Sequence, residues 1–228
     1  MILYLTIQAA LVACIVFLGA CSNGNQNNTI GQLDNLVGVK HTATESRKSD
    51  FETRVLREAT ASIQSGDLVT RRGNDLTSFL MSNMNPTDRS FSHCGIASIE
   101  DDTIFIYHAI GGEFNPDQKL KRESLYSFAH PADNKALGTF KPELNTFDIK
   151  KVISYIKIQY LNQLPFDMEF DLNTDERQYC SEFAAKSYGT VWDSLNWIAI
   201  THQAGRKFIP IESLFLNKNM IERKRWVY

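Results

Sequence analysis

A cysteine lies at the point where a polar, acidic loop gives way to a helical pattern. Cys180 follows the loop 166–179 and opens an amphipathic run that extends to Tyr188. Backbone amides at a helix N-terminus carry partial positive charge, which favours the thiolate form of a cysteine over the thiol. The thiolate is the form that attacks a carbonyl carbon. The sequence therefore indicates Cys180 as a candidate nucleophile that needs a base.

Two of the five histidines lie in strand-like sequence and are candidates for that base. His93 lies in the run 92–99 and His108 in the run 103–110, with an acidic turn at 100–102 between them. Neighbouring antiparallel strands place cross-strand Cβ atoms roughly 5 Å apart, so one imidazole can lie beside the other. A cysteine hydrolase needs such a pair, because one imidazole holds the thiolate and protonates the leaving group while a second polar group fixes its tautomer. The other three, His41, His130 and His202, lie in tether or loop sequence.

The N-terminal segment has the features of a bacterial lipoprotein signal. Residues 2–18 are almost wholly apolar, residues 18–21 (Leu-Gly-Ala-Cys) have the form of a lipobox, and a polar, Asn-rich stretch follows. The apolar core is too short for a comfortable membrane span. No Lys or Arg precedes it, so a start further upstream and an uncleaved anchor are the alternatives. We expect a signal peptide over 1–20, a lipidated Cys21 with a flexible tether over 21–49, and one folded domain over 50–228. The chain would then be lipid-anchored in the cell envelope, on the periplasmic side.

Charge and cysteine usage narrow the class of protein. The formal net charge of −2 gives no electrostatic case for nucleic-acid binding. After processing at Cys21, Cys94 and Cys180 are the remaining thiols, and a single bridge between them is the alternative to a free nucleophile. Alternation along a strand argues against that bridge: if His93 faces Cys180, then Cys94 faces away from it.

Hydrophobic periodicity predicts an α+β domain. Helices are predicted over 50–64, 74–84, 123–129, 147–164 and 180–188. Strands are predicted over 67–72, 92–99, 103–110 and 136–140. The aromatic C-terminal third gives no clear pattern. The candidate residues thus lie on two neighbouring strands and on a later helix.

Five short motifs follow one another along this framework. They are Gly-Asp-Leu-Val at 66–69, Ser-His-Cys-Gly-Ile at 92–96, Tyr-His-Ala at 107–109, Pro-Phe-Asp at 165–167 and Tyr-Cys-Ser-Glu at 179–182. Their order resembles the circularly permuted NlpC/P60 cysteine hydrolases of the YiiX/YebB type. The resemblance implies a permuted papain-like fold, in which an antiparallel sheet packs against helices and one helix carries the cysteine. It also implies Cys180 as nucleophile, His93 as base and His108 as the third polar residue, where relatives commonly have glutamate.

The resemblance implies an acyl-enzyme mechanism without a cofactor. Cys180 attacks an amide, ester or thioester carbonyl, the oxyanion rests on the Cys180 amide and a second donor, and His93 protonates the leaving group. Gln178 and Tyr179 are the nearest side chains for that second donor, with packing roles as the alternative.

Other interpretations stay open. A zinc ion held by His93, His108 and Cys180 would keep an open coordination position. The domain is alternatively a lipid acyltransferase or esterase, since permuted relatives include acyltransferases, or a catalytically silent binding module held at the membrane by its lipid. A location near the cell wall suggests peptidoglycan stem peptides as substrates, with lipids and other amides as the second class.

Overall fold

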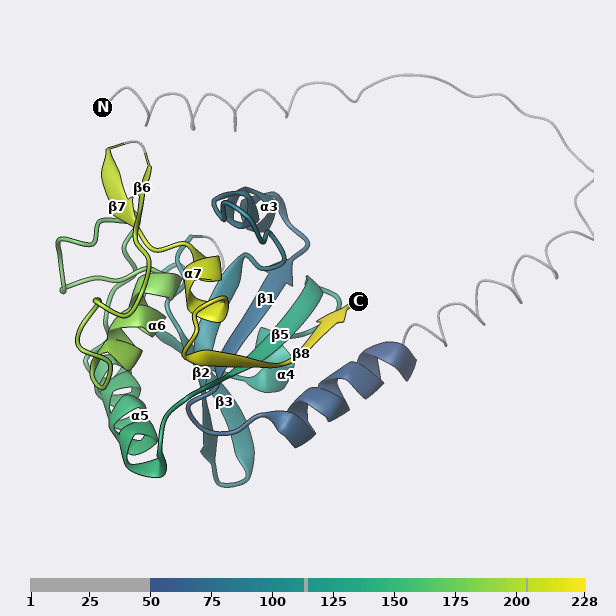
Figure 1. Ribbon diagram of the computed structural model, residues 1–228. Coiled ribbons are helices and arrows are strands. Elements are labelled where there is room, and N and C mark those ends of the chain that lie inside the picture. The colour runs from purple at the N-terminus through teal and green to yellow at the C-terminus, as the bar shows by residue number, and fades with distance from the viewer. Residues whose placement is uncertain (1–49, 113–114, 204) are drawn as a thin grey trace, which may run out of the picture. The chain divides into compact units, whose positions relative to one another are not determined.

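The fold is built around one six-stranded sheet. The computed structural model describes residues 50–112, 115–203 and 205–228 (Figure 1). The sheet has the spatial order β4-β3-β2-β1-β5-β8, and every neighbouring pair is antiparallel. Its strands are β1 (Leu68–Gly73), β2 (His93–Glu100), β3 (Thr103–His108), β4 (Lys121–Ser124), β5 (Asn134–Pro142) and β8 (Met220–Val227). A separate ribbon pairs β6 (Thr201–Gln203) with β7 (Arg206–Phe208).

Helices cover both faces of the sheet (Figure 1). On one face lie α5 (Thr146–Leu161), α6 (Cys180–Gly189) and α7 (Ile211–Phe215), and on the other lie the helix at 50–62 and α4 (Leu125–Phe128). The first core includes Cys94, Ile96, Val152, Ile156, Phe183 and Leu214. The second includes Val55, Val69, Ile106, Phe128, Leu137 and Trp226. The sheet thus separates two hydrophobic cores, which confirms the predicted class of an antiparallel sheet packed against helices.

The hairpin of β2 and β3 carries the two histidines. Its register pairs Ile96 with Tyr107 and Glu100 with Thr103. Asp101 and Asp102 make the turn with φ angles of 46° and 61°, in the left-handed region that aspartate tolerates better than most residues. Both strands begin and end within two residues of the predicted ranges.

One prediction of local structure is wrong. The range 123–129, predicted as a helix, contains the end of β4 and the short α4. Glu123 pairs with Ile106 of β3, and the Ser124 side chain accepts the Ser127 N–H at the start of α4. All four residues of this edge strand are half-buried, so β4 lacks the alternation that marks a strand in sequence.

Two more helices are shorter than predicted. The helix α5 ends at Leu161, because Asn162 caps it and Gln163 takes a φ of 56°. The helix α3 (Leu76–Asn83) begins after Asp75, whose side chain accepts the Ser78 N–H as an N-cap.

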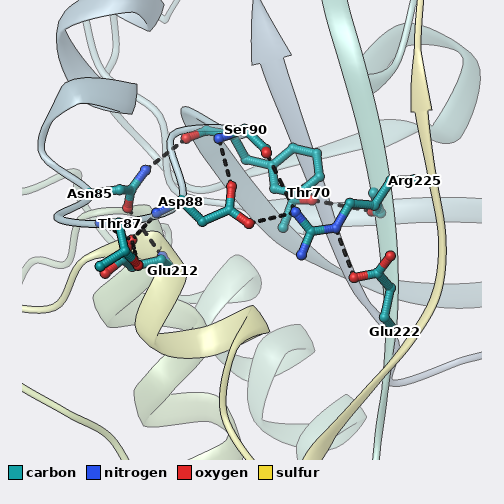
Figure 2. Close-up of polar contacts among 10 residues, drawn as sticks. Thr70, Asn85, Thr87, Asp88, Ser90, Glu212, Glu222 and Arg225 are labelled. Carbon is teal, nitrogen blue, oxygen red and sulfur yellow. Dashed lines mark hydrogen bonds and ion pairs between the residues drawn. The ribbon is translucent and has the colours of Figure 1, made fainter.

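Arg225 of β8 fastens the loop that leads into β2 (Figure 2). Its guanidinium donates to Asp88 Oδ2 at 2.6 Å and to Glu222 Oε2 at 2.8 Å. The same group lies 5.0–5.5 Å from the centres of three rings, those of Phe91, Phe140 and Phe215. The C-terminal strand, which the sequence leaves unassigned, therefore anchors residues next to the predicted site.

Glu212 of α7 holds the same loop from the other side (Figure 2). Its Oε2 accepts the N–H groups of Thr87 and Asp88 at 2.8 and 2.6 Å. Its own N–H donates to Asn85 Oδ1 at 3.1 Å. The entry to β2, and with it the position of His93, is fixed by two elements that come later in the chain.

The expected signal peptide, lipidation site and tether at 1–49 lie outside the described residues. Within the described part of the chain, no helix combines the length and apolar character needed to cross a membrane.

Candidate active site

Cys180 is the first residue of α6, as predicted. Tyr179 has an extended backbone and forms the N-cap, and its N–H donates to Glu182 Oε2 at 3.3 Å. Because Cys180 is the first helical residue, the backbone N–H groups at the start of α6 have no carbonyl partner within the helix. Hydrogen bonding by the Cys94 side chain and by the Cys180 and Ser181 amides lowers the pKa of the Cys180 thiol. The thiolate is favoured for the reason that the sequence suggests, with Cys94 as an added partner.

The Cys180 side chain lines a small pocket. Its walls are mainly apolar and come from α3, the loops 84–92 and 166–179, β7 and α7, and the cavity volume is about 10 Å³, room for about one water molecule. The lining includes Met81, Asn85, Ser92, Phe170, Phe208 and Ile211. A group that enters the pocket meets the thiol among aromatic and aliphatic side chains.

Cys94, and not His93, is the β2 side chain that meets Cys180. Both cysteines are free and buried, and the contact between their side chains shifts the pKa of each. Cys94 pairs with Thr70 of β1 and lies in the core beneath α6. The expectation that Cys94 turns away from Cys180 is therefore wrong, because β2 presents Cys94 and Ile96 to the helix.

The two histidines lie side by side, as the hairpin predicts. His93 Nε2 lies 2.8 Å from His108 Nδ1. On its far side, His108 Nε2 lies 3.3 Å from Glu123 Oε2, close enough for an ion pair although not a well-formed hydrogen bond. The three side chains form a continuous chain from β2 across β3 to β4.

Glu123 is the site residue that the sequence prediction misses. A helix over 123–129 would give it no relation to the hairpin. In β4 it pairs with Ile106, two residues before His108 on the adjacent strand, and so shares a face with the imidazole. Prediction of a third short strand at 121–124 would have placed Glu123 beside the hairpin. The residues of this strand have no clear hydrophobic alternation, so the sequence does not reveal it.

Burial and neighbouring charges keep the imidazoles neutral. Burial, together with Arg71 and His108, lowers the pKa of His93 well below its usual value. Burial also lowers the pKa of His108 and outweighs the opposing effect of Glu123. The contact with His108 lowers the pKa of Glu123 to about 2, so this carboxylate is ionised.

These protonation states fix the direction of the chain. If the Nε2–H of His108 faces the Glu123 carboxylate, then His108 Nδ1 accepts a hydrogen bond from His93 Nε2–H. The other nitrogen of His93, Nδ1, then keeps its lone pair. The arrangement can supply a neutral base at His93 Nδ1.

The His93 ring and the Cys180 thiol point toward opposite faces of the sheet. The His93 ring packs against Phe128 with their centres 5.7 Å apart, and Phe128 belongs to the core that includes α4. Cys94 and Cys180 belong to the other core. Among the described residues, no hydrogen bond joins His93 to Cys180. The structure brings the two histidines together and leaves the thiol with Cys94.

The side chains considered for the oxyanion hole have structural partners. Gln178 is buried, and its Nε2 donates to the Tyr155 hydroxyl at 3.5 Å. The Tyr179 hydroxyl accepts the Ile209 N–H at 2.9 Å. The amide of Cys180 itself is the donor that remains beside the thiol.

A metal site does not fit these residues. Across 50–112, 115–203 and 205–228, no group of three or more His, Cys, Asp or Glu side chains is placed to hold a metal ion. His93, His108 and Cys180, the ligands of the zinc alternative, do not converge on one point.

Comparison with known proteins identifies the fold. No protein-family model and no curated protein matches the chain. A solved structure described as metalloprotein yiiX from Escherichia coli O157:H7 (DUF1105) is similar, with a TM-score of 0.58 and 15% sequence identity. The match covers 72% of this chain and 98% of that chain. At this level of identity the likeness concerns the backbone alone, and the chain has a YiiX-like fold.

Proposed function

We propose that this protein is a thiol-dependent hydrolase that cleaves an amide or ester bond through an acyl-enzyme at Cys180. One observation carries the proposal: a cysteine of lowered pKa, at a helix N-terminus, lines an apolar pocket. Such a thiol is a candidate nucleophile, and the proposal requires the pocket, which has room for about one water molecule, to open when substrate binds. The YiiX-like fold supports the proposal as a scaffold and carries no argument about chemistry.

In this mechanism the Cys180 thiolate adds to the carbonyl carbon, and the carbonyl oxygen takes the negative charge. The Cys180 and Ser181 amides at the start of α6 stabilise that oxyanion. Collapse of the intermediate breaks the bond to the leaving amine or alcohol, which takes up a proton. Water then adds to the thioester, releases the acid and restores the thiol.

His93 is the proposed proton carrier. Its Nδ1 would take and return the proton, while Glu123 stabilises the imidazolium through His108. The proposal requires His93 and Cys180 to come together when substrate binds while the contact between His93 Nε2 and His108 Nδ1 is kept. His93 is the first residue of β2, so the change affects a strand end. Catalytic hydrogen bonds often form fully only in the complex with substrate.

The pocket lining favours a second candidate substrate class. Once the pocket has opened, its lining by Met81, Phe170, Phe208 and Ile211 would suit an acyl chain better than a polar peptide. Lipid esterase or acyltransferase activity at the same thiol is therefore the second candidate, beside cleavage of peptidoglycan stem peptides. A lipid anchor in the cell envelope would give the protein access to both substrates.

Selective alkylation tests the nucleophile. The full-length protein is treated with limiting iodoacetamide from about pH 5 upward, and the labelled cysteine is mapped by mass spectrometry. We expect Cys180 to be alkylated at lower pH than Cys94, and we expect Cys94→Ser to raise the pH at which Cys180 reacts, because Cys94 is the largest cause of its lowered pKa. The control is His130→Ala, since His130 bonds Tyr126 at the surface and should not affect the thiol.

Substrate assays complete the test. Wild type and Cys180→Ser are incubated with purified muropeptides and, separately, with a lipid extract. Product from one of these substrates that disappears in Cys180→Ser identifies the class. Equal, sluggish alkylation of both cysteines with no product from either substrate would reject the hydrolase and favour a binding module.

A further inference from the structure

Cys94 and Cys180 form a thiol pair beside the pocket. They are the two free cysteines of the described residues, and their side chains influence each other's pKa through direct contact. One comes from β2 and the other from α6, and both lie in the same hydrophobic core. Neighbouring sulfurs on two packed elements are the starting geometry for a disulfide.

The two thiols differ in access and in acidity. Cys180 lines the pocket, whereas Cys94 does not and is 0% exposed. The hydrogen bond from Cys94 lowers the pKa of Cys180, while burial and Cys180 itself raise the pKa of Cys94 well above its usual value. A dissolved oxidant therefore meets Cys180 first, and Cys180 is the thiol with the larger thiolate fraction.

We propose that this pair is an oxidation site, at which a peroxide converts Cys180 to a sulfenic acid and Cys94 resolves it as an intramolecular Cys94–Cys180 disulfide. Cys94 is the group that stands in contact with the oxidised sulfur. The proposal names peroxides as the class of oxidant and dithiols as the class of reductant that reverses the reaction.

The chemistry balances in two steps. The Cys180 thiolate attacks one peroxide oxygen, the O–O bond breaks, and hydroxide leaves from hydrogen peroxide. The hydroxide released in the first step takes the Cys94 proton, and the Cys94 thiolate attacks Cys180 sulfur; the S–O bond breaks and hydroxide leaves. Two thiols lose two electrons to the peroxide.

The bridge has two consequences. It protects Cys180 from further oxidation to the sulfinic acid, which is not reversed by simple thiols. It also removes the nucleophile, so it would switch off hydrolysis. This second consequence rests on the proposed function, whereas formation of the bridge does not.

Peptide mapping tests the proposal on the full-length protein. The reduced protein is treated with hydrogen peroxide, remaining thiols are blocked with N-ethylmaleimide, and a tryptic digest is analysed without reduction. Trypsin leaves Cys94 in the peptide 90–119 and Cys180 in the peptide 178–186. We expect these two peptides to be linked after oxidation and to separate, each with a free thiol, after treatment with dithiothreitol.

Variants of Cys94 separate resolution from simple proximity. In Cys94→Ser the sulfenic acid at Cys180 has no resolving thiol, so dimedone should label it and excess peroxide should convert it to the sulfinic acid. Cys94→Ala guards against an effect of the serine hydroxyl, and circular dichroism verifies that both variants fold. Sulfinic acid at Cys180 of the wild type, with Cys94 still reduced, would overturn the proposal.

Failure of this proposal and failure of the proposed function give different results. A reversible bridge in a protein that cleaves neither substrate class leaves the oxidation site standing and rejects the hydrolase. Product formation that depends on Cys180, without any bridge, rejects the oxidation site and supports the hydrolase.

Discussion

Glu123 lies at the end of the histidine chain. Its carboxylate is ionised, since its pKa is about 2, and it lies 3.3 Å from His108 Nε2. His108 thereby presents Nδ1 to His93 as an acceptor. A carboxylate that acts through an intervening neutral ring can still stabilise an imidazolium on His93, although less strongly than one in direct contact.

Removal of the Glu123 charge is the residue-scale test of this chain. Glu123→Gln keeps the shape of the side chain, and we expect kcat/KM to fall about 10–100-fold with little change in KM, because Glu123 supports the base without touching substrate. The pKa of His93 should fall further, so the acid limb of the pH–rate profile should move to lower pH. The control is the exposed Glu143→Gln. An unchanged profile in Glu123→Gln would separate Glu123 from the reaction.

Glu182 is a buried carboxylate two residues after the nucleophile, in the first turn of α6. It lies 2.8 Å from Lys186 Nζ, and Lys186 also donates to Thr174 O at 2.9 Å and to Asp175 Oδ1 at 2.5 Å. The group ties the start of α6 to the loop 166–179, which forms one wall of the pocket.

Burial of Glu182 should make stability depend on pH. Burial raises its pKa from 4.5 to about 7, so the folded chain binds this proton more tightly than the unfolded chain. The associated stability is fully present below pH 4.5 and is lost as pH rises through 7, a change of about 3 kcal/mol. Urea unfolding across this range should give a flatter dependence in Glu182→Gln than in wild type. The exposed Glu176→Gln should keep the wild-type slope, and an equal slope in both variants would contradict the assignment.

At the scale of residues, only part of the candidate site could be predicted from the sequence. Cys180 at a helix start and the contact between His93 and His108 are both predictable, because each follows from local pattern and hairpin register. The face of β2 that packs against α6 could not be predicted. Residues 94–98 of β2 are all buried, so both faces of the strand are apolar and no alternation distinguishes them.

At the scale of elements, predictability follows the strength of the hydrophobic pattern. The long helix α5 and the strands of the hairpin are visible in sequence, because one helix face and long apolar runs specify them. The edge strand β4 and the charged strand β8 are not, because half-exposed residues give no period. Their positions depend on register with β3 and β5, which is a tertiary property.

The contacts of Arg225 predict how strongly β8 holds the site. Arg225→Met keeps much of the apolar stem but loses the bonds to Asp88 and Glu222 and the stacking over Phe91. We expect a loss of about 1–2 kcal/mol in the free energy of unfolding, measured by urea titration. Arg57→Met, at an exposed position of the helix 50–62, should cost much less. Equal effects would mean that the Arg225 network contributes no more than ordinary surface charges.

At the scale of the whole molecule, the sheet separates the candidate nucleophile from the candidate base. The thiol pair lies in the core beneath α6, and the histidine chain lies in the core that includes α4. The histidine chain and the thiol pair are closest in sequence at the start of β2, where His93 and Cys94 are consecutive residues. Arg225 and Glu212 hold the loop before this point, so the hydrolase proposal depends on a part of the fold that is anchored from the C-terminal third.

Attachment to a membrane is the remaining whole-molecule prediction. If the lipobox is processed, the chain begins at Cys21 and carries acyl chains, and more than one chain makes attachment to a bilayer stable. Metabolic labelling with a palmitate analogue in a bacterial host should mark the wild type and Cys14→Ser but not Cys21→Ser, because Cys14 leaves with the signal peptide. Intact-protein mass spectrometry should find a mature chain that starts at Cys21. A membrane-bound chain that retains residues 1–20 and takes no label would instead establish the apolar segment as an uncleaved anchor.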